Sequence, residues 1–156
     1  MPVPRALQIG QDIGSYRLIR LLGEGGMGAV YEVVHQGIGR RAAMKFLTLD
    51  TKAHPELTAR FVNEARAANR IAHPGVVQVY EFGQLEDGTP WMLMEFLEGE
   101  TLSERLRALR RAGQVFGRDG LLLLHQLASV LNAAHSRGIV HRDLFAPSPP
   151  QSLAFQ

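Results

Sequence analysis

The sequence predicts an α+β fold in two parts, with strands before about residue 97 and helices after it. Three observations support this. β-branched and aromatic runs alternate with glycine-containing turns in the first half, one helical apolar stripe interrupts them, and apolar residues recur at helical spacing after residue 100. With 46% hydrophobic and 21% charged residues, the chain can bury a sizeable core, which excludes disorder over most of its length.

Five segments of the first half have the composition of strands: 16–22, 29–34, 41–49, 76–82 and 91–96. The first two flank a glycine-rich turn and predict a hairpin, and the third extends it to an antiparallel meander. In the third segment, Ala43, Lys45 and Leu47 fall on one side. Ala42, Met44 and Phe46 fall on the other.

A helix is predicted between the third and fourth strands. Pro55 lies near its first position, and His73-Pro74-Gly75 ends it. Its apolar stripe consists of Leu57, Phe61, Ala65, Ala68 and Ala72.

Two helices are predicted in the second half. Thr101 and Glu104 form a capping-box pattern that begins a short helix ending near Ala112. Asp119 is expected to cap a longer helix that ends at Gly138.

The predicted organisation has four parts. They are an N-terminal extension (1–12), a sheet-rich lobe (13–97), a helical lobe (98–144) and an irregular tail (145–156) that contains three prolines and no periodic pattern.

Composition excludes several classes of function. The 17 Lys and Arg residues against 15 Asp and Glu leave a net charge of +2, which argues against an electrostatic binder of nucleic acid or of membrane surfaces. The absence of cysteine excludes disulfide scaffolds and thiol nucleophiles. The longest apolar run, 121–124, is far too short for a membrane span, so a cytoplasmic protein is expected.

Glycines at 23, 25 and 28 match the pattern G-x-G-x-x-G. Glycine lets backbone amides approach phosphate oxygens, although it serves any tight hairpin equally well. A dinucleotide-binding module would need a helix after the third glycine, whereas the sequence there predicts a strand. The pattern therefore favours a loop that folds over phosphates.

Lys45 is one of only two lysines and lies in an apolar strand. It could be an edge-strand lysine whose ammonium reaches solvent. However, Glu64 is predicted on the buried stripe of the helix, where a carboxylate needs a partner. The sequence therefore predicts a Lys45–Glu64 ion pair.

His141-Arg142-Asp143 follows the strand-like pair Ile139-Val140. Such a tripeptide is usually a surface loop. Packed from behind by that pair, Asp143 could instead accept a proton from a substrate hydroxyl.

Together these motifs resemble a protein kinase catalytic domain over about residues 13–144. The resemblance rests on the glycine-rich loop followed by Val30, on Ala-Ala-Met-Lys at 42–45, on Glu64, and on His-Arg-Asp-Leu at 141–144. The segment Gly-Gly-Met-Gly-Ala-Val-Tyr-Glu at 25–32 is most similar to that of bacterial eukaryotic-like Ser/Thr kinases.

The resemblance implies transfer of the γ-phosphoryl group of ATP to a protein hydroxyl. Lys45 would contact the phosphates, Glu64 would orient Lys45, and Asp143 would act as the base. Met94 would be the gatekeeper and 95–97 the hinge that meets adenine. The implied ATP-binding residues are Leu22, Gly23, Gly25, Gly28, Val30, Ala43, Lys45, Met94, Glu95 and Leu97.

The sequence also departs from the family pattern. Phe145 stands where Ser/Thr kinases have a lysine, Ser148 stands where the magnesium-binding asparagine is expected, and no D-F-G follows. The magnesium that the family uses therefore lacks its ligands. We expect a truncated and inactive chain. The alternatives are a nucleotide-binding pseudokinase, an interaction fragment or, least favoured, a dinucleotide-binding module.

The last helix is expected to expose an apolar stripe. Exposed apolar side chains of this kind favour self-association. The predicted stripe consists of Leu123, Leu127, Val130, Leu131 and Ala134.

Overall fold

The computed structural model describes residues 7–25, 28–48 and 55–140. The chain divides into two compact units. The first is Met1–Asn69 with Gln78–Phe96, and the second is Arg70–Val77 with Leu97–Gln156.

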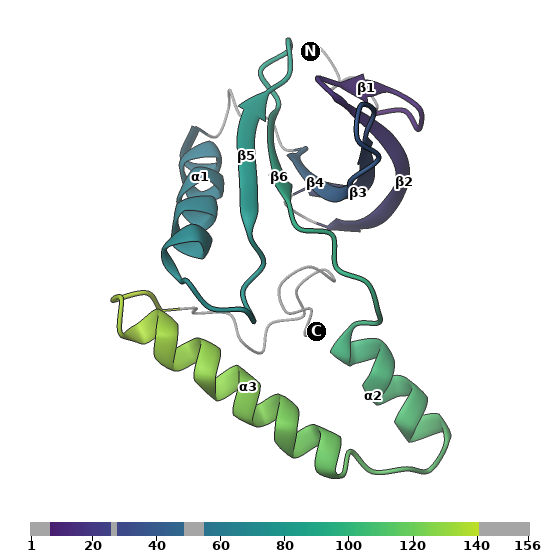
Figure 1. Cartoon of the computed structure of the whole chain (residues 1–156), viewed down its shortest axis with the longest axis vertical. Helices are drawn as coiled ribbons and strands as arrows, with labels where there is room; N and C mark the ends of the chain where they lie inside the picture. The colour runs from purple at the N-terminus through teal and green to yellow at the C-terminus, as the bar shows by residue number, and fades with distance from the viewer. Residues whose placement is uncertain (1–6, 26–27, 49–54, 141–156) are drawn as a thin grey trace. The chain divides into compact units, whose positions relative to one another are not determined.

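The first unit contains an antiparallel sheet that curls strongly, as Figure 1 shows. Its strands lie in the order β1-β2-β3-β4-β6-β5, so β5 is an edge strand. The strands are β1 (Asp12–Ile13), β2 (Tyr16–Gly25), β3 (Gly28–His35), β4 (Arg41–Leu47), β5 (Val79–Gln84) and β6 (Pro90–Met94).

The predicted meander is confirmed, because β2, β3 and β4 pair in sequence and antiparallel. The sheet has six strands among the described residues rather than the predicted five. The additional strand, β1, has two residues, too few to produce a period-2 pattern.

The two faces of the sheet bury different clusters. One face holds a cluster that includes Leu18, Val33, Met44 and Phe46, none of which is exposed at all. Leu47 belongs to a second cluster with residues of the helix α1. The predicted alternation along β4 is therefore confirmed.

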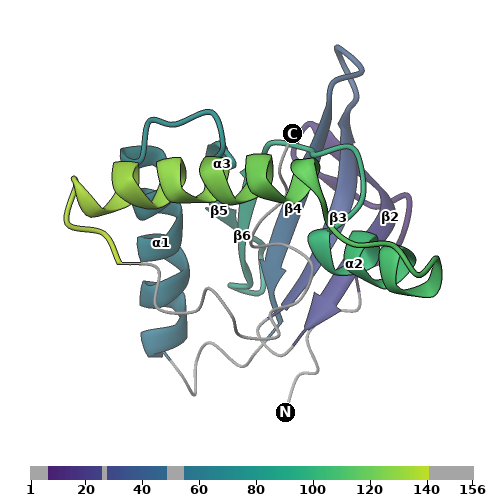
Figure 2. The same cartoon turned by 90° about the horizontal axis from the view of Figure 1, so that it is seen from below.

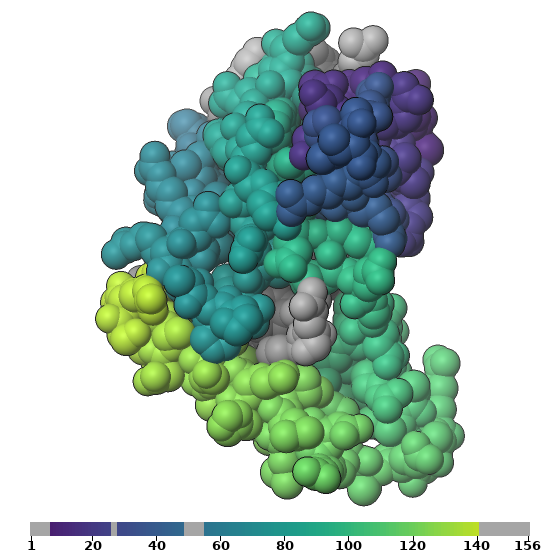
Figure 3. Space-filling model, viewed as in Figure 1, coloured from purple at the N-terminus to yellow at the C-terminus, as the bar shows by residue number. Residues whose placement is uncertain are grey.

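The helix α1 (Pro55–Arg70) lies on the β5–β6 side of the sheet, as Figures 1 and 2 agree. Phe61 and Ala65 are its buried residues, and both belong to one hydrophobic cluster with Leu47 of β4 and Met92 of β6. The space-filling view in Figure 3 shows the side chains of α1 directly against those of β5.

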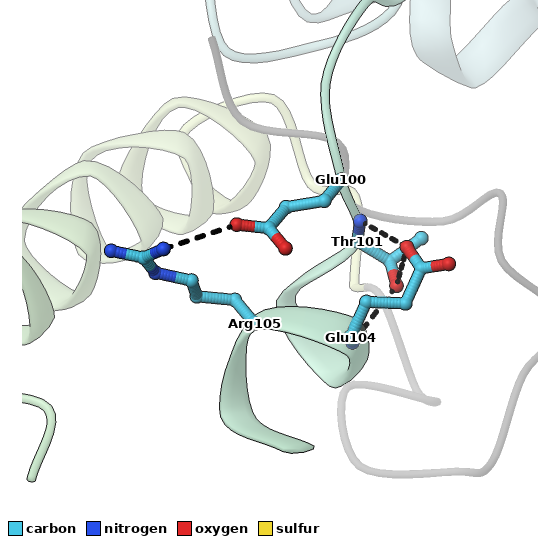
Figure 4. Close-up of polar contacts among 4 residues, drawn as sticks. All are labelled: Glu100, Thr101, Glu104 and Arg105. Atoms are coloured by element: carbon cyan, nitrogen blue, oxygen red, sulfur yellow. Dashed lines mark hydrogen bonds and ion pairs between the residues drawn. The ribbon is translucent and has the colours of Figure 1, made fainter. Parts of the chain in front are cut away.

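The second unit contains α2 (Leu102–Arg111) and α3 (Arg118–His135). The predicted capping box of α2 is confirmed. The Glu104 N–H donates to the Thr101 hydroxyl at 3.2 Å, and the Thr101 N–H donates to Glu104 Oε2 at 2.7 Å, as Figure 4 shows. The two hydrogen bonds thus satisfy N–H groups that the first turn of a helix leaves unpaired.

The predicted cap of α3 is wrong. Gly117 occupies the N-cap position without a side-chain hydrogen bond, and Asp119 lies inside the first turn. An acidic residue there still interacts favourably with the helix dipole, which explains why the sequence signals for the two positions are similar.

Both helices end in the same way. Gly113 (φ 63°) and Gly138 (φ 71°) adopt left-handed backbone conformations just past the helix ends. The N–H of Gln114 donates to the carbonyl of Leu109, and that of Ile139 donates to the carbonyl of Ala134. These are Schellman motifs, which satisfy carbonyls left open at a helix end.

The predicted exposed stripe of α3 is wrong in position. Val130 and Ala134 are buried, and the other members of the stripe are half-buried. The exposed leucines of α3 are Leu121, Leu122 and Leu124.

Residues 70–77 of the same unit contact α3 at Val130 and at its neighbour Ser129. A Cβ at Gly75 would lie 2.7 Å from Cγ2 of Val130, and His73 Nε2 lies 3.0 Å from the Ser129 hydroxyl. The sequence predicted residues 73–75 only as the end of α1 and residues 76–82 as a strand, so the contact was missed.

Candidate functional site

The predicted ion pair between β4 and α1 is present. Lys45 Nζ lies 3.0 Å from Oε1 and 3.2 Å from Oε2 of Glu64. Lys45 is central in the sheet, opposite Val30 of β3 and Met92 of β6. Its ammonium also lies 5.6 Å from the centre of the Phe61 ring.

The predicted burial of Glu64 is wrong. Its side chain is 61% exposed, whereas that of Lys45 is 17% exposed. Glu64 follows Phe61 by three residues, or about 300° of helical turn, which places it at the edge of the stripe rather than on it. The lysine, not the carboxylate, is therefore the partner that is largely withdrawn from water.

The sheet groups four of the predicted ATP-binding residues on one face. Val30 and Lys45 are cross-strand partners, as are Ala43 and Met94. Directly opposed residues in adjacent strands point to the same face. Val30 and Ala43 are buried, at 3% and 6% exposure.

The predicted glycine-rich hairpin is present up to its turn. β2 and β3 pair through Gly23 with Val30 and Gly25 with Gly28, and residues 26–27 lie outside the described part. A Cβ at Gly28 would collide with the backbone oxygen of Phe46. This glycine is therefore required by the packing of β3 on β4, whatever else the loop does. Leu22, next to this pairing, is half-buried.

The predicted hinge begins where β6 ends. The Glu95 N–H donates to the carbonyl of Gln78 at 2.9 Å, and the Gln78 N–H lies 3.4 Å from Glu95 Oε2. These contacts join the start of the hinge to the residue before β5. Leu97 belongs to the second unit.

Sequence reasoning missed a carboxylate on the same face of the sheet. Glu32 is 5% exposed and lies opposite Ala43. Its oxygens accept hydrogen bonds from Arg20 Nε at 2.6 Å and Arg41 Nε at 2.7 Å. The available signal was a charged residue in an apolar strand, which is also the signal that identified Lys45.

Burial alone would raise the pKa of Glu32 by penalising its charged form. The hydrogen bonds from Arg41 and Arg20 outweigh burial and hold the pKa below its ordinary value. Glu32 is therefore an ionised carboxylate enclosed by two cations.

A second missed contact fixes the end of α1 to the edge strand. The Asn69 side chain donates to the carbonyl of Val79 at 3.0 Å and accepts from its N–H at 3.2 Å. One amide side chain thus satisfies both backbone groups of a residue in β5, and it connects the helix that carries Glu64 with the sheet.

The predicted catalytic Asp143 lies outside the described residues, as do His141 and Arg142. Among the described residues, no group of three or more His, Asp or Glu side chains could hold a metal ion. Nor does any described helix have the length and apolar character needed to cross a membrane.

Comparison with known proteins matches residues 16–146 to the protein kinase domain. The chain is 45% identical over 139 residues to the serine/threonine-protein kinase Pkn1 of Myxococcus xanthus, a match that covers 87% of this chain and 19% of that protein. It is 39% identical over 135 residues to the serine/threonine-protein kinase PknA of Mycobacterium tuberculosis. This match covers 84% of this chain and 31% of PknA.

Solved structures agree. The crystal structure of the M. tuberculosis PknI kinase domain superposes with a TM-score of 0.71 at 31% identity, covering 89% of this chain and 55% of that one. The chain spans about a fifth to a third of the length of these curated relatives. The family match covers most of the chain, so the chain belongs to the protein kinase domain family, with serine/threonine kinases of bacteria among its relatives.

Proposed function

We propose that this chain binds ATP on the sheet face that carries Val30, Ala43 and Lys45, as the nucleotide-binding part of a serine/threonine protein kinase. The observation that carries the proposal is the Lys45–Glu64 ion pair at 3.0 Å. An ammonium has three N–H donors, so a lysine oriented by one carboxylate can still donate to a phosphate oxygen.

The base of the nucleotide would lie between apolar side chains of the same face. Leu22, Val30 and Ala43 would contact adenine, and Met94 would border the pocket as gatekeeper. The backbone of 95–97 would bond the adenine edge. The glycines at 23, 25 and 28 would let the hairpin approach the phosphates.

The reaction proposed for the whole protein is transfer of the γ-phosphoryl group of ATP to a serine or threonine hydroxyl of a protein, with Asp143 as the base. For the 156-residue chain itself we propose binding without transfer. Phe145 and Ser148 replace the lysine and asparagine of the family pattern, and the asparagine is a magnesium ligand there. A cytoplasmic location stays a prediction.

Nucleotide binding is tested by a thermal shift with ATP. A ligand at 100 times its Kd stabilises the folded state by about 2.7 kcal/mol, which such an assay detects. Lys45→Met is expected to abolish the shift and Glu64→Gln to reduce it. Lys52→Met is the matched control, since Lys52 is the only other lysine of the chain.

Magnesium should add little to the shift, because Ser148 stands where the family pattern has its magnesium-binding asparagine. A much larger shift with magnesium than without it would contradict this part of the proposal. No shift in either condition would favour an interaction fragment over a nucleotide-binding chain.

An interaction role has an observation of its own in the second unit. Leu121, Leu122 and Leu124 are 53–70% exposed on α3. Exposed apolar side chains favour association with another apolar surface. We propose that the chain self-associates there. Light scattering should show a smaller species for Leu122→Glu, whereas equal masses for both proteins would reject the surface.

A further inference from the structure

Arg41 connects the buried Glu32 with the hinge. Its Nε donates to Glu32 Oε1 at 2.7 Å, and its guanidinium carbon lies 4.1 Å from the centre of the Phe96 ring. We propose that Arg41 is a positioning residue for nucleotide recognition, which holds the hinge where its backbone can bond the adenine edge. This inference rests on the proposed function.

The anchor of Arg41 is fixed on both sides. Glu32 lies on the central strand of the β2-β3-β4 meander and is 5% exposed. Arg20 holds its second oxygen at 2.6 Å. A planar guanidinium that donates to such a carboxylate loses much of its rotational freedom, so it presents a fixed surface to an aromatic ring.

The hinge needs such a contact because the strand pairing ends before it. Met94 is the last residue of β6, and it pairs with Ala43 and Val79. The Glu95 N–H makes one further backbone bond, to Gln78. Phe96 lies beyond the ladder, so stacking of Arg41 on its ring extends the order of the sheet into the hinge.

The adjacent arginine provides an internal control. The guanidinium carbon of Arg40 lies 4.4 Å from the centre of the Tyr80 ring, on β5. Arg40 and Arg41 therefore make the same type of contact, but only Arg41 makes it with the hinge. Arg40→Gln and Arg41→Gln each remove one charge and one cation–aromatic contact, and Arg41→Gln also removes the hydrogen bond to Glu32.

The test compares the affinities for ADP and inosine diphosphate, which differ at the base edge that a hinge would read. Arg41→Gln is expected to reduce the ADP preference by about threefold to tenfold, from the size of a cation–aromatic contact. Arg40→Gln should leave the preference unchanged. Lys45→Met should weaken both nucleotides equally, because it acts on the phosphates.

Phe96→Leu removes only the ring and keeps the Glu32–Arg41 pair, so it serves if Arg41→Gln folds poorly. It should reduce the preference as Arg41→Gln does, and Phe96→Tyr should recover most of it. If Arg41→Gln and Phe96→Leu weaken both nucleotides by the same factor, the inference is overturned while nucleotide binding stands.

Hydrogen exchange of the nucleotide-free chain separates the two proposals. Exchange of the Glu95 amide should be faster in Arg41→Gln than in Arg40→Gln or the unmodified chain. Equal exchange in all three overturns the inference even if ADP binds. An unmodified chain that binds neither nucleotide overturns the proposed function, and with it the role of Arg41 at the base.

Discussion

The sheet of the first unit and the helices of the second are stabilised differently. The sheet buries Leu18, Met44 and Phe46 without any exposure. Helix α2 buries none of its residues, and α3 buries only one side chain larger than alanine, Val130. In the first unit, packing between residues far apart in the sequence provides most of the burial that stabilises the fold. In the second, contacts close in sequence, such as helix caps, have a larger share.

The largest expected effect is a cavity in the sheet. Phe46→Ala should lower the free energy of unfolding by about 3–5 kcal/mol, because Phe46 is fully buried and its ring packs edge-on against Tyr31. Urea unfolding followed by the fluorescence of Trp91, which packs against the same cluster, measures the loss.

Leu122→Ala is the matched change in the second unit. The side chain is 53% exposed, so the free energy of unfolding should change by no more than about 0.5 kcal/mol. Equal losses for Phe46→Ala and Leu122→Ala would remove the contrast between the units.

An effect smaller than that of Phe46→Ala is expected from the buried carboxylate of the sheet. Glu32→Gln should lower the free energy of unfolding by about 1–3 kcal/mol at neutral pH, because two charge-assisted hydrogen bonds are weakened around a buried group. Arg20 and Arg41 are themselves half-exposed, which keeps the loss below that of a fully buried ion pair.

The same variant has a pH signature. The pKa of Glu32 lies below its ordinary value near 4.5 in the folded chain, so its ionisation stabilises the fold above that value. The difference between the original chain and Glu32→Gln should be full at neutral pH. It should shrink as the pH falls below about 4.5 toward the lower folded-state pKa. A difference that grows in acid would contradict the ion network.

Period-2 patterns predicted the sheet well because each residue's face is decided by its own strand. The alternation of Met44 and Lys45 on opposite faces is the clearest case. The sequence could not predict how residues 70–77 contact Val130, because that contact joins segments far apart in the chain. The two-residue strand β1 has too little sequence to carry a pattern.

The site residues were likewise predicted where a local sequence pattern marks them and missed where only a contact with a distant segment does. Lys45 and Glu64 were predicted as a pair from one unusual lysine and one carboxylate on a helix, although which of the two is withdrawn from water was wrong. The Asn69 contact with β5 has no sequence signal, because an exposed asparagine near a helix end is common. Glu32 could have been found from the sequence, because it is a charged residue within an apolar strand.

A local effect is expected from the cap of α2. Thr101→Ala should cost about 1 kcal/mol of helix stability, because the Glu104 N–H loses its acceptor. Hydrogen exchange should become faster in the first turn of α2 and stay unchanged in the sheet. Ser103→Ala is the control, because its hydroxyl makes only a 3.5 Å contact with Arg107. Faster exchange in the sheet would contradict this prediction, because it would show that the loss of the cap also affects the first unit.

The smallest expected effect concerns the ion pair next to that cap. Glu100 Oε1 lies 3.4 Å from Arg105 Nη1, and both side chains are 50% exposed (Figure 4). Solvent screens such a pair, so Glu100→Gln should change the free energy of unfolding by at most about 0.5 kcal/mol. The difference should vanish in about 1 M salt, where the Debye length is about 3 Å. Glu32→Gln, whose partners enclose a buried carboxylate, should keep most of its effect in the same salt. If salt removed both differences alike, burial would not distinguish the ion pairs of the two units.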